Sequence, residues 1–453
     1  MIKWKLLAAL PLLAGALWAA PSDANDLVLP EKIFPGLDVI LKSAVNQSPR
    51  MVDKNIDLEI AENDRIAARA ALLPTVSGYY RDYESRDRRA DLEAAGEGPV
   101  NVQKVYYDAS INQPLFYWGE KKNTARMGAI RQRIAQGQYQ EAYRLLAQDL
   151  RARYLALISV KIVAARARFN QKFTHDQLQL AEDRLKNRVI SENDIFPTRL
   201  NAERADIEVE RVAFEFENSL QALARLSGTQ PLTEDAVPDT MPPVAYLSDT
   251  IGQLLNAYTS QKDLPSVEAA TLREQIAVQN LDFGIQKYRL YPKFSLAAGV
   301  SQDEQAYALG QPKYQVNSVY AGFSVSWAIF DGFASRSAQR SSLARKRQLE
   351  NDYEETTVRL VEQAKSESRQ IYFAARTMSI DDRFLTSSEG YVKTRQDEFS
   401  RGVISEADVS LAQLALFDSR IVSYRSRADF LTKIGDFLGT VNADPVVANA
   451  PIR

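Results

Sequence analysis

The chain has 453 residues, of which 45% are hydrophobic and 25% are charged, and its 56 basic and 58 acidic side chains leave a formal net charge of −2. This length permits more than one folded unit, and the near-neutral charge gives no compositional support for nucleic-acid binding. The chain has no cysteine, which excludes disulfides, thiolate metal sites, cysteine nucleophiles and a lipidated N-terminal cysteine.

The N-terminus has the pattern of a secretory signal. A positive start, "MIKWK", precedes the apolar run "LLAALPLLAGALW", and small residues follow it. This run is shorter than the roughly 20 residues that a helix needs to cross a bilayer. We therefore expect residues 1–24 to be a signal peptide, cleaved after Ala20 or Ala24. No later stretch is long and apolar enough to span, so an exported chain of this kind would enter a membrane only with strands.

Two similar heptapeptides, "RVISEND" at 188–194 and "GVISEAD" at 402–408, indicate that the chain consists of two related halves. The same spacing separates Phe116 in "PLFYWGEKK" from Phe330 in "AIFDGFASR". Similarity at a fixed spacing predicts a tandem repeat. We predict a first repeat over 36–228, a connecting segment over 229–260, a second repeat over 261–440 and a C-terminal tail over 441–453.

Each predicted repeat starts with a helical segment that ends at a proline, followed by two strand-like segments. We expect the strands at about 75–86 and 104–116, and again at about 293–302 and 315–330. In "SVYAGFSVSWAI" the side chains alternate, with Val319 and Phe323 facing one way and Ser318 and Ser324 the other. Alternation of this kind predicts strands with one apolar and one polar side.

A long helical stretch follows the second strand of each repeat, at about 120–187 and about 334–401. At 1.5 Å per residue such a helix would measure about 100 Å, and it would need partners along its whole length. The pattern therefore predicts long antiparallel coiled coils. His175, the single histidine, falls in the first of these stretches and has no partner motif, so we expect it at a helix surface or interface.

The two heptapeptides are predicted to reverse the chain at the end of each long helix. Their S-x-x-D pattern is a variant of the capping box. Gly402 suits a left-handed helix end, where the first repeat has Arg188 instead. Pro197 favours Asp194 as the N-cap of the first returning helix, because the proline then lies in its first turn.

Four strands cannot close a membrane barrel, because lipid leaves an open sheet edge without hydrogen bonds and the smallest known barrels have about eight strands. The apolar faces therefore predict a barrel shared between chains. Tyr106, Tyr107, Tyr320 and Trp327 are candidate interfacial aromatics. A soluble β-sandwich with one wet face is the alternative for the strands alone, but it would not need the long helices.

The passages "QPLFYWGEKKNTAR" and "SWAIFDGFASRSAQR" and the turns "RVISEND" and "GVISEADVSLAQ", in this order, resemble the TolC-like outer membrane efflux proteins over about 36–440. The resemblance implies a mainly α-helical fold with membrane strands. A homotrimer would form a barrel of about 12 strands in the outer membrane of a Gram-negative-type cell, above a periplasmic α-helical barrel of antiparallel coiled coils. It implies a channel for passive export, with no enzymatic activity, cofactor or metal.

The resemblance also implies roles for residues. The turns would dock onto a periplasmic adaptor that joins the channel to an inner-membrane pump. By position, the contact residues are Arg188, Val189, Ile190, Ser191, Gly402, Val403, Ile404 and Ser405. Asp194 and Asp408 match an acidic ring that narrows the tunnel entrance and favours cations. A second acidic position of the family is Leu411 here, and Ile404 replaces an arginine that can lock the gate, so Arg188 and Arg401 are nearby alternatives for a latch.

Two other functions use related architecture. Type I protein secretion and polysaccharide export employ the same channel fold, and the sequence does not separate them from drug efflux. A periplasmic adaptor also has helical hairpins, but it needs a compact lipoyl-like domain and no paired amphipathic strands. An enzyme has no support, because the chain lacks a P-loop, a nucleophile elbow and a metal-spaced cluster.

Overall fold

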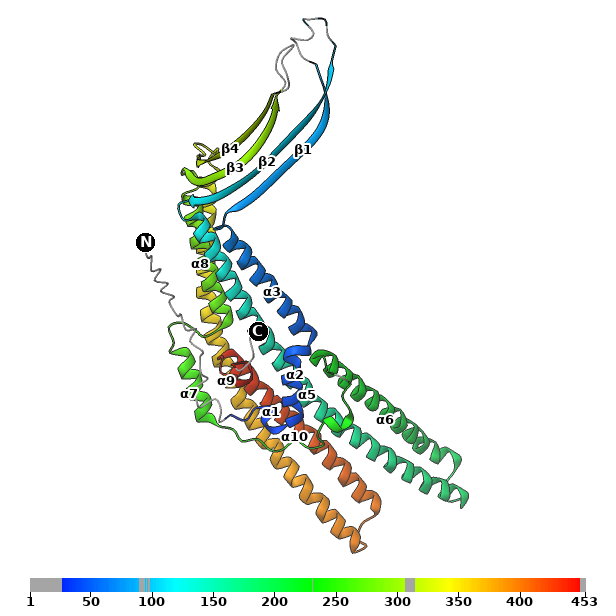
Figure 1. Cartoon of the computed structure of the whole chain (residues 1–453). Helices are drawn as coiled ribbons and strands as arrows, with labels where there is room; N and C mark the ends of the chain where they lie inside the picture. The colour runs from blue at the N-terminus through cyan, green and yellow to red at the C-terminus, as the bar shows by residue number, and fades with distance from the viewer. Residues whose placement is uncertain are drawn as a thin grey trace, which may run out of the picture. The chain divides into compact units, whose positions relative to one another are not determined.

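The computed structural model describes residues 27–88, 94, 96, 98–229, 231–305 and 314–448 (Figure 1). The expected signal peptide, 1–24, and the end of the expected tail, 449–453, lie outside the described residues. The described residues are mainly helical, with one four-stranded antiparallel sheet. Among the helices in these ranges, none combines the length and the apolar character needed to cross a membrane.

The main elements occur twice in the same order. The first run comprises α3 (Pro49–Ala70), β1 (Thr75–Asp87), β2 (Val100–Phe116), α5 (Glu120–Lys186) and α6 (Glu192–Ser227). The second comprises α8 (Val267–Lys287), β3 (Lys293–Gln305), β4 (Tyr314–Ser326), α9 (Ala334–Ser400) and α10 (Glu406–Thr440). Shorter elements are α1 (Pro30–Ile33), α2 (Pro35–Gln47), η2 (Glu234–Ala236), α7 (Ser248–Thr259) and α11 (Pro445–Ala448). Helices α5 and α9 each have 67 residues.

The chain forms two compact units, and each takes residues from both runs. Residues 56–137 and 270–355 form the sheet unit, which contains β1 to β4. The remaining described residues form the hairpin unit, which contains α6, α7 and α10. Helices α3, α5, α8 and α9 contribute residues to both units. The sequence halves are therefore not the compact units of the fold.

In the sheet unit, the strands lie in the order β1-β2-β3-β4 and every neighbouring pair is antiparallel. Residues that pair across strands share a face of the sheet. One row of paired residues is Val76, Ile111, Ala298 and Ala321. The next row is Ser77, Ser110, Gly299 and Tyr320. The register thus gives the sheet one mainly apolar and one mainly polar face, as the alternation in the sequence predicts.

The helices of the sheet unit form a layer in the order α3-α5-α8-α9. Helix α3 contacts α5 closely, because a Cβ at Gly128 would lie 2.6 Å from the Cβ of Ala68. Helix α5 pairs with α8 through Arg133, whose guanidinium lies 2.8 Å from the Glu274 carboxylate. Helix α9 bonds to α8 through Gln339, which donates to the Gln286 carbonyl at 3.2 Å. The outer helices of this layer are α3 and α9.

The hairpin unit contains two antiparallel helical hairpins, which we call the first hairpin (α5 and α6) and the second hairpin (α9 and α10). Within the first, Gln171 and His175 of α5 both bond to Asp206 of α6 at 2.8 Å. Within the second, Ser423 of α10 donates to Asp382 of α9 at 2.7 Å. His175 is exposed, in agreement with its expected place at a helix surface.

The two hairpins contact each other through α5 and α10. The Nε atom of Arg166 lies 2.5 Å from the Asp418 carboxylate, and the rings of Phe169 and Phe417 are 5.6 Å apart. The order of helices in this part of the unit is therefore α6-α5-α10-α9. As a result, α6 and α9 form its outer edges.

Both ends of the described chain and the connecting segment are attached to the hairpins. Arg151 of α5 is 1% exposed and forms ion pairs with Glu31 at 2.6 Å and Asp444 at 2.5 Å. Tyr154 of α5 donates to the Ala236 carbonyl at 2.9 Å, and Arg427 of α10 donates to the Met241 carbonyl. Removing one partner from such a buried ion pair is expected to destabilise the unit strongly.

Candidate functional site

The first candidate surface consists of the two turns that join the helices of each hairpin, which we call the first tip (188–194) and the second tip (402–408). Each long helix ends in the same hydrogen-bonded motif, with Val189 N–H donating to the Arg184 carbonyl at 2.8 Å and Val403 N–H to the Glu398 carbonyl at 3.0 Å. This motif needs a left-handed residue just after the helix. Gly402 provides it with φ 74°, while Arg188 provides it with φ 59° despite its side chain.

Each returning helix then begins at a reciprocal cap. In the first tip, the Asp194 carboxylate accepts from Ser191 N–H at 2.9 Å and Ser191 Oγ at 2.7 Å. In the second, Asp408 accepts from Ser405 N–H at 3.0 Å and Ser405 Oγ at 2.7 Å. These hydrogen bonds, mainly those from the serine hydroxyls, hold the pKa of both aspartate carboxyls below the usual value. Both predicted acidic-ring residues are exposed, and each is the third residue of its helix, with a carboxylate that binds back to the N-cap serine.

The predicted cap of α6 was wrong. Asp194 is not the N-cap, because α6 begins at Glu192 with Ser191 in that place. The Asp194 carboxylate accepts hydrogen bonds from Ser191, so the helix begins three residues before the start predicted from Pro197. Pro197 lies inside α6, where its missing N–H leaves the Asn193 carbonyl without its helical donor. Only a short stretch of helix precedes the proline, which keeps the disruption local.

The tips present apolar side chains to solvent. Val189 and Val403 are each 69% exposed, while Ile190 and Ile404 are half-buried. Leu411 is also exposed. Of the two arginines considered for a latch, Arg188 is exposed, and Arg401 donates to the Asp397 carbonyl of its own helix at 3.1 Å. Each tip is thus a small apolar surface supported by its own cap.

A second candidate surface was missed in the sequence. Large apolar side chains are exposed along α6 and α9, the two edges of the hairpin layer. On α6 they are Phe196, Ile207 and Phe214, and on α9 they are Phe373, Ile380, Phe384 and Tyr391. Most steps between them are seven or four residues, the spacing of a coiled-coil seam. We call these the α6 stripe and the α9 stripe.

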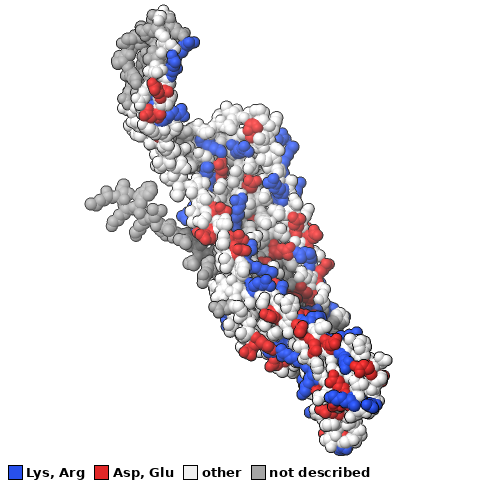
Figure 2. All heavy atoms as spheres, turned by 90° about the vertical axis from the view of Figure 1, so that its right-hand side faces the viewer, with Lys and Arg blue, Asp and Glu red and all other residues white. Residues whose placement is uncertain are grey.

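Figure 2 shows how charged side chains are distributed over one face of the described residues. On the face drawn in Figure 2, basic and acidic side chains are interspersed along the helices. Such a surface gives no large field of one sign. Within the described ranges, histidine, aspartate and glutamate side chains do not form a cluster of three or more that could hold a metal ion.

Comparison with known proteins shows which solved structures have a similar fold. The fold is similar to the CmeC outer membrane channel of Campylobacter jejuni, with TM-score 0.68 and 13% identity over 90% of this chain and 86% of that one. It is also similar to the outer membrane protein VceC of Vibrio cholerae (TM-score 0.63, 15% identity, 89% and 95%). The open MtrE outer membrane channel of Neisseria gonorrhoeae gives TM-score 0.64 and 14% identity over 90% and 89%.

In sequence, the model of the outer membrane efflux protein family matches residues 258–432. The resemblance to the TolC-like outer membrane efflux proteins is confirmed. No curated protein matches the chain. The matched residues include α8, β3, β4 and α9, which belong to the second run. The efflux-family fold, with its four strands and two long hairpins, is therefore established for this chain.

Proposed function

We propose that this protein is the outer membrane channel of a tripartite efflux system, through which substrates leave the cell passively. The observation that carries this proposal is the sheet. It has an apolar and a polar face, and neither β1 nor β4 pairs at its outer edge with another described strand. A lipid-facing sheet must close on itself. Three copies, with four strands each, would form one barrel of about 12 strands with the apolar face toward lipid and the polar face toward a watery lumen.

The helices support the same assembly. The outer elements of the sheet unit are β1 and α3 at one edge and β4 and α9 at the other. In the hairpin layer, the α6 stripe and the α9 stripe lie at opposite edges, so a copy of the chain offers one stripe to each neighbour. Contact between two different edges is heterologous, and such contacts form a ring when the rotation from one copy to the next closes. We infer a homotrimer in which α9 of one copy packs against α6 of the next.

The tips are proposed to dock onto a periplasmic adaptor, and through it to reach an inner-membrane pump. Exposed Val189 and Val403 support this role, because twinned apolar residues at the ends of hairpins favour a partner surface. Asp194 and Asp408 remain proposed members of an acidic ring at the tunnel entrance. Each carboxylate keeps a free lone pair while it accepts its cap hydrogen bonds, so capping and a ring of charge are compatible.

The proposal includes export across the inner membrane with residues 1–24 as signal peptide, and residence in the outer membrane without a lipid anchor on cysteine. The tandem-repeat boundaries predicted above, with a connecting segment over 229–260, belong to the same proposal. A type I protein-secretion or polysaccharide export channel of the same fold is the alternative function. A periplasmic adaptor is disfavoured by the amphipathic four-stranded sheet.

Conductance in a planar bilayer tests the function. The purified mature protein, shown to be trimeric in detergent, is expected to give small cation-selective currents. Replacing Asp194 and Asp408 with asparagine removes the charge but keeps an oxygen that can accept the cap hydrogen bonds. If the acidic ring exists, this double variant loses cation selectivity. A folded trimer that forms no pore would refute the channel, and unchanged selectivity would reduce the two aspartates to helix caps.

A further inference from the structure

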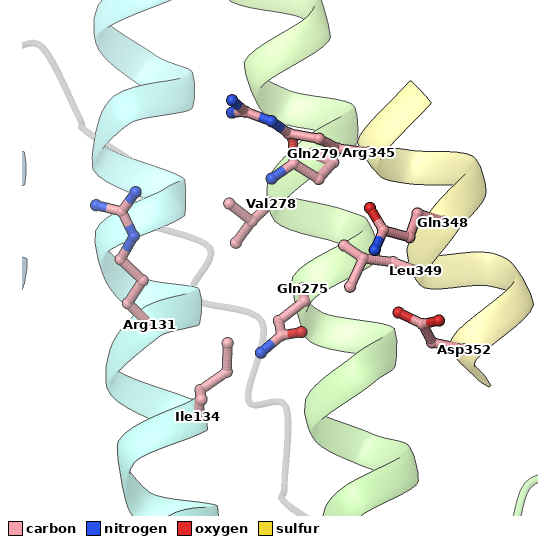
Figure 3. A pocket seen from close by; sticks show the side chains of 9 residues that line it. All are labelled: Arg131, Ile134, Gln275, Val278, Gln279, Arg345, Gln348, Leu349 and Asp352. Carbon is pink, nitrogen blue, oxygen red and sulfur yellow. The ribbon is translucent and has the colours of Figure 1, made fainter. Parts of the chain in front are cut away.

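The sheet unit contains a hollow of about 430 Å³ that the proposed export function does not use (Figure 3). Helix α5 lines it with Arg131 and Ile134, α8 with Val278 and Gln279, and α9 with Arg345 among others. In Figure 3 the hollow lies over α8, with α5 on one side and α9 on the other. Its volume is within the range of small-molecule sites, about 300–1,000 Å³.

Polar groups around this hollow lack partners, unlike those close by. Next to it along α5, Arg133 binds Glu274 through both arms of its guanidinium, at 2.9 and 2.8 Å. In contrast, the exposed side chains of Arg131 and Arg345 have no hydrogen bond or ion pair with another residue in the described ranges. The carbonyl Oε1 of Gln279 is buried and also has no partner among the described residues. A buried acceptor without a donor is costly, so a bound molecule with a donor would stabilise it.

The rest of the lining defines what such a molecule would look like. Ile134, Val278 and Leu349 are half-buried and give the hollow an apolar side. The lining contains two guanidiniums, those of Arg131 and Arg345, and one carboxylate, that of Asp352, so its net charge favours an anion. Arginine is suited to bind a carboxylate through two parallel hydrogen bonds. In Figure 3 the Arg345 side chain extends from α9 toward the side of the hollow where Gln279 of α8 lies.

We infer that this hollow binds a small amphipathic carboxylic acid that carries an N–H group near its carboxylate. The carboxylate lies against Arg131 and Arg345, the N–H donates to Gln279 Oε1, and the apolar group lies on Ile134, Val278 and Leu349. This binding does not depend on export, because the site is complete within the sheet unit of one chain.

The test uses N-benzoylglycine, which has the carboxylate, the N–H group and the apolar group. Its binding to the full mature protein in a nonionic detergent is measured by isothermal titration calorimetry. Saturable binding is expected. The uncharged N-benzoylglycinamide is expected to bind about tenfold more weakly or worse, because it loses the charge-assisted hydrogen bonds. Replacing Arg131 and Arg345 with glutamine is expected to weaken the binding of N-benzoylglycine by a similar factor. The matched control replaces Arg126 and Arg340, which are exposed on the same two helices, and leaves binding unchanged.

A second comparison tests the buried acceptor. The acid 4-phenylbutanoate has the same chain length as N-benzoylglycine but no N–H, so the native protein is expected to prefer N-benzoylglycine. Gln279→Leu should fold, since it removes an acceptor that has no partner, and it should abolish this preference. The inference is overturned if N-benzoylglycine shows no saturable binding or if its neutral amide binds equally well. It is also overturned if replacing the control pair, Arg126 and Arg340, reduces binding as much as replacing Arg131 and Arg345. Binding without any bilayer current would support this site and contradict only the channel.

Discussion

The two hairpins follow the same plan with different residues. The second tip turns at Gly402, whereas the first turns at Arg188 in the same left-handed conformation. Just inside the second tip, Leu385 and Val392 of α9 pack on Ala412 and Leu416 of α10 as a buried cluster. The first hairpin has Pro197 near the start of its returning helix instead.

This difference suggests a division of roles. A tip with an arginine in a left-handed conformation and a proline in its returning helix is expected to open at a lower free energy than a tip with glycine at the same place. We therefore expect the first tip to open locally more often than the second. If the channel opens at its tips, the first hairpin is the one that yields first.

The largest expected effect concerns the edges that the two hairpins present. Phe384→Glu on α9 and Phe214→Glu on α6 each place a carboxylate in the proposed contact between copies, where burying an unpaired charge costs several kcal/mol. Each variant is expected to lose the trimer in size-exclusion chromatography with light scattering. Lys393→Glu, on α9 but outside the stripe, is the control and should remain trimeric. A trimer that survives both stripe changes would contradict the α9-on-α6 contact.

The next effect tests the apolar cluster of the second hairpin. Leu416→Ala removes a buried side chain and is expected to lower the free energy of local opening near the second tip by about 2–4 kcal/mol. The same place in the first hairpin, by the spacing of the two tips, is Ala202, which is already small and buried. Hydrogen exchange of the first turns of α10 measures the loss. If the variant α10 still opens less readily than α6, the cluster does not explain the difference between the hairpins.

Giving each tip the turn residue of the other is expected to change the stability of the two tips by a smaller amount and in opposite directions. Arg188→Gly relieves a side chain from a left-handed conformation and is expected to stabilise the first tip by about 1 kcal/mol. Gly402→Arg is expected to destabilise the second tip by a similar amount. Hydrogen exchange at both tips, measured in each variant, gives the two changes. Equal responses at both tips would mean that the surroundings, and not the residue type, set the cost of this turn.

Much of this fold was predictable because its signals are local. Alternation fixed the faces of β3 and β4, and proline and the S-x-x-D pattern marked the ends of helices. The α6 cap was mispredicted because Pro197 was given more weight than the reciprocal bond between Ser191 and Asp194. The α6 and α9 stripes were missed because heptad spacing on a long helix does not reveal which face lacks a partner. The hollow around Gln279 was not predictable, since it depends on how three helices distant in sequence pack together.

The smallest effect is the response of the two caps to pH. Both Asp194 and Asp408 have a pKa below the usual 3.8, because their ionised forms accept hydrogen bonds from serine. Their contribution to stability is therefore complete above about pH 3.8 and is lost as the pH falls through the lower pKa of the folded state. Acid should increase hydrogen exchange at both tips, and more at the first, which has Arg188 in a left-handed conformation and Pro197 in its returning helix. Asp194→Asn and Asp408→Asn should each remove this pH dependence at their own tip only. If the second tip responds more strongly to acid, the first is not the weaker of the two, and the order of opening proposed for the hairpins is reversed.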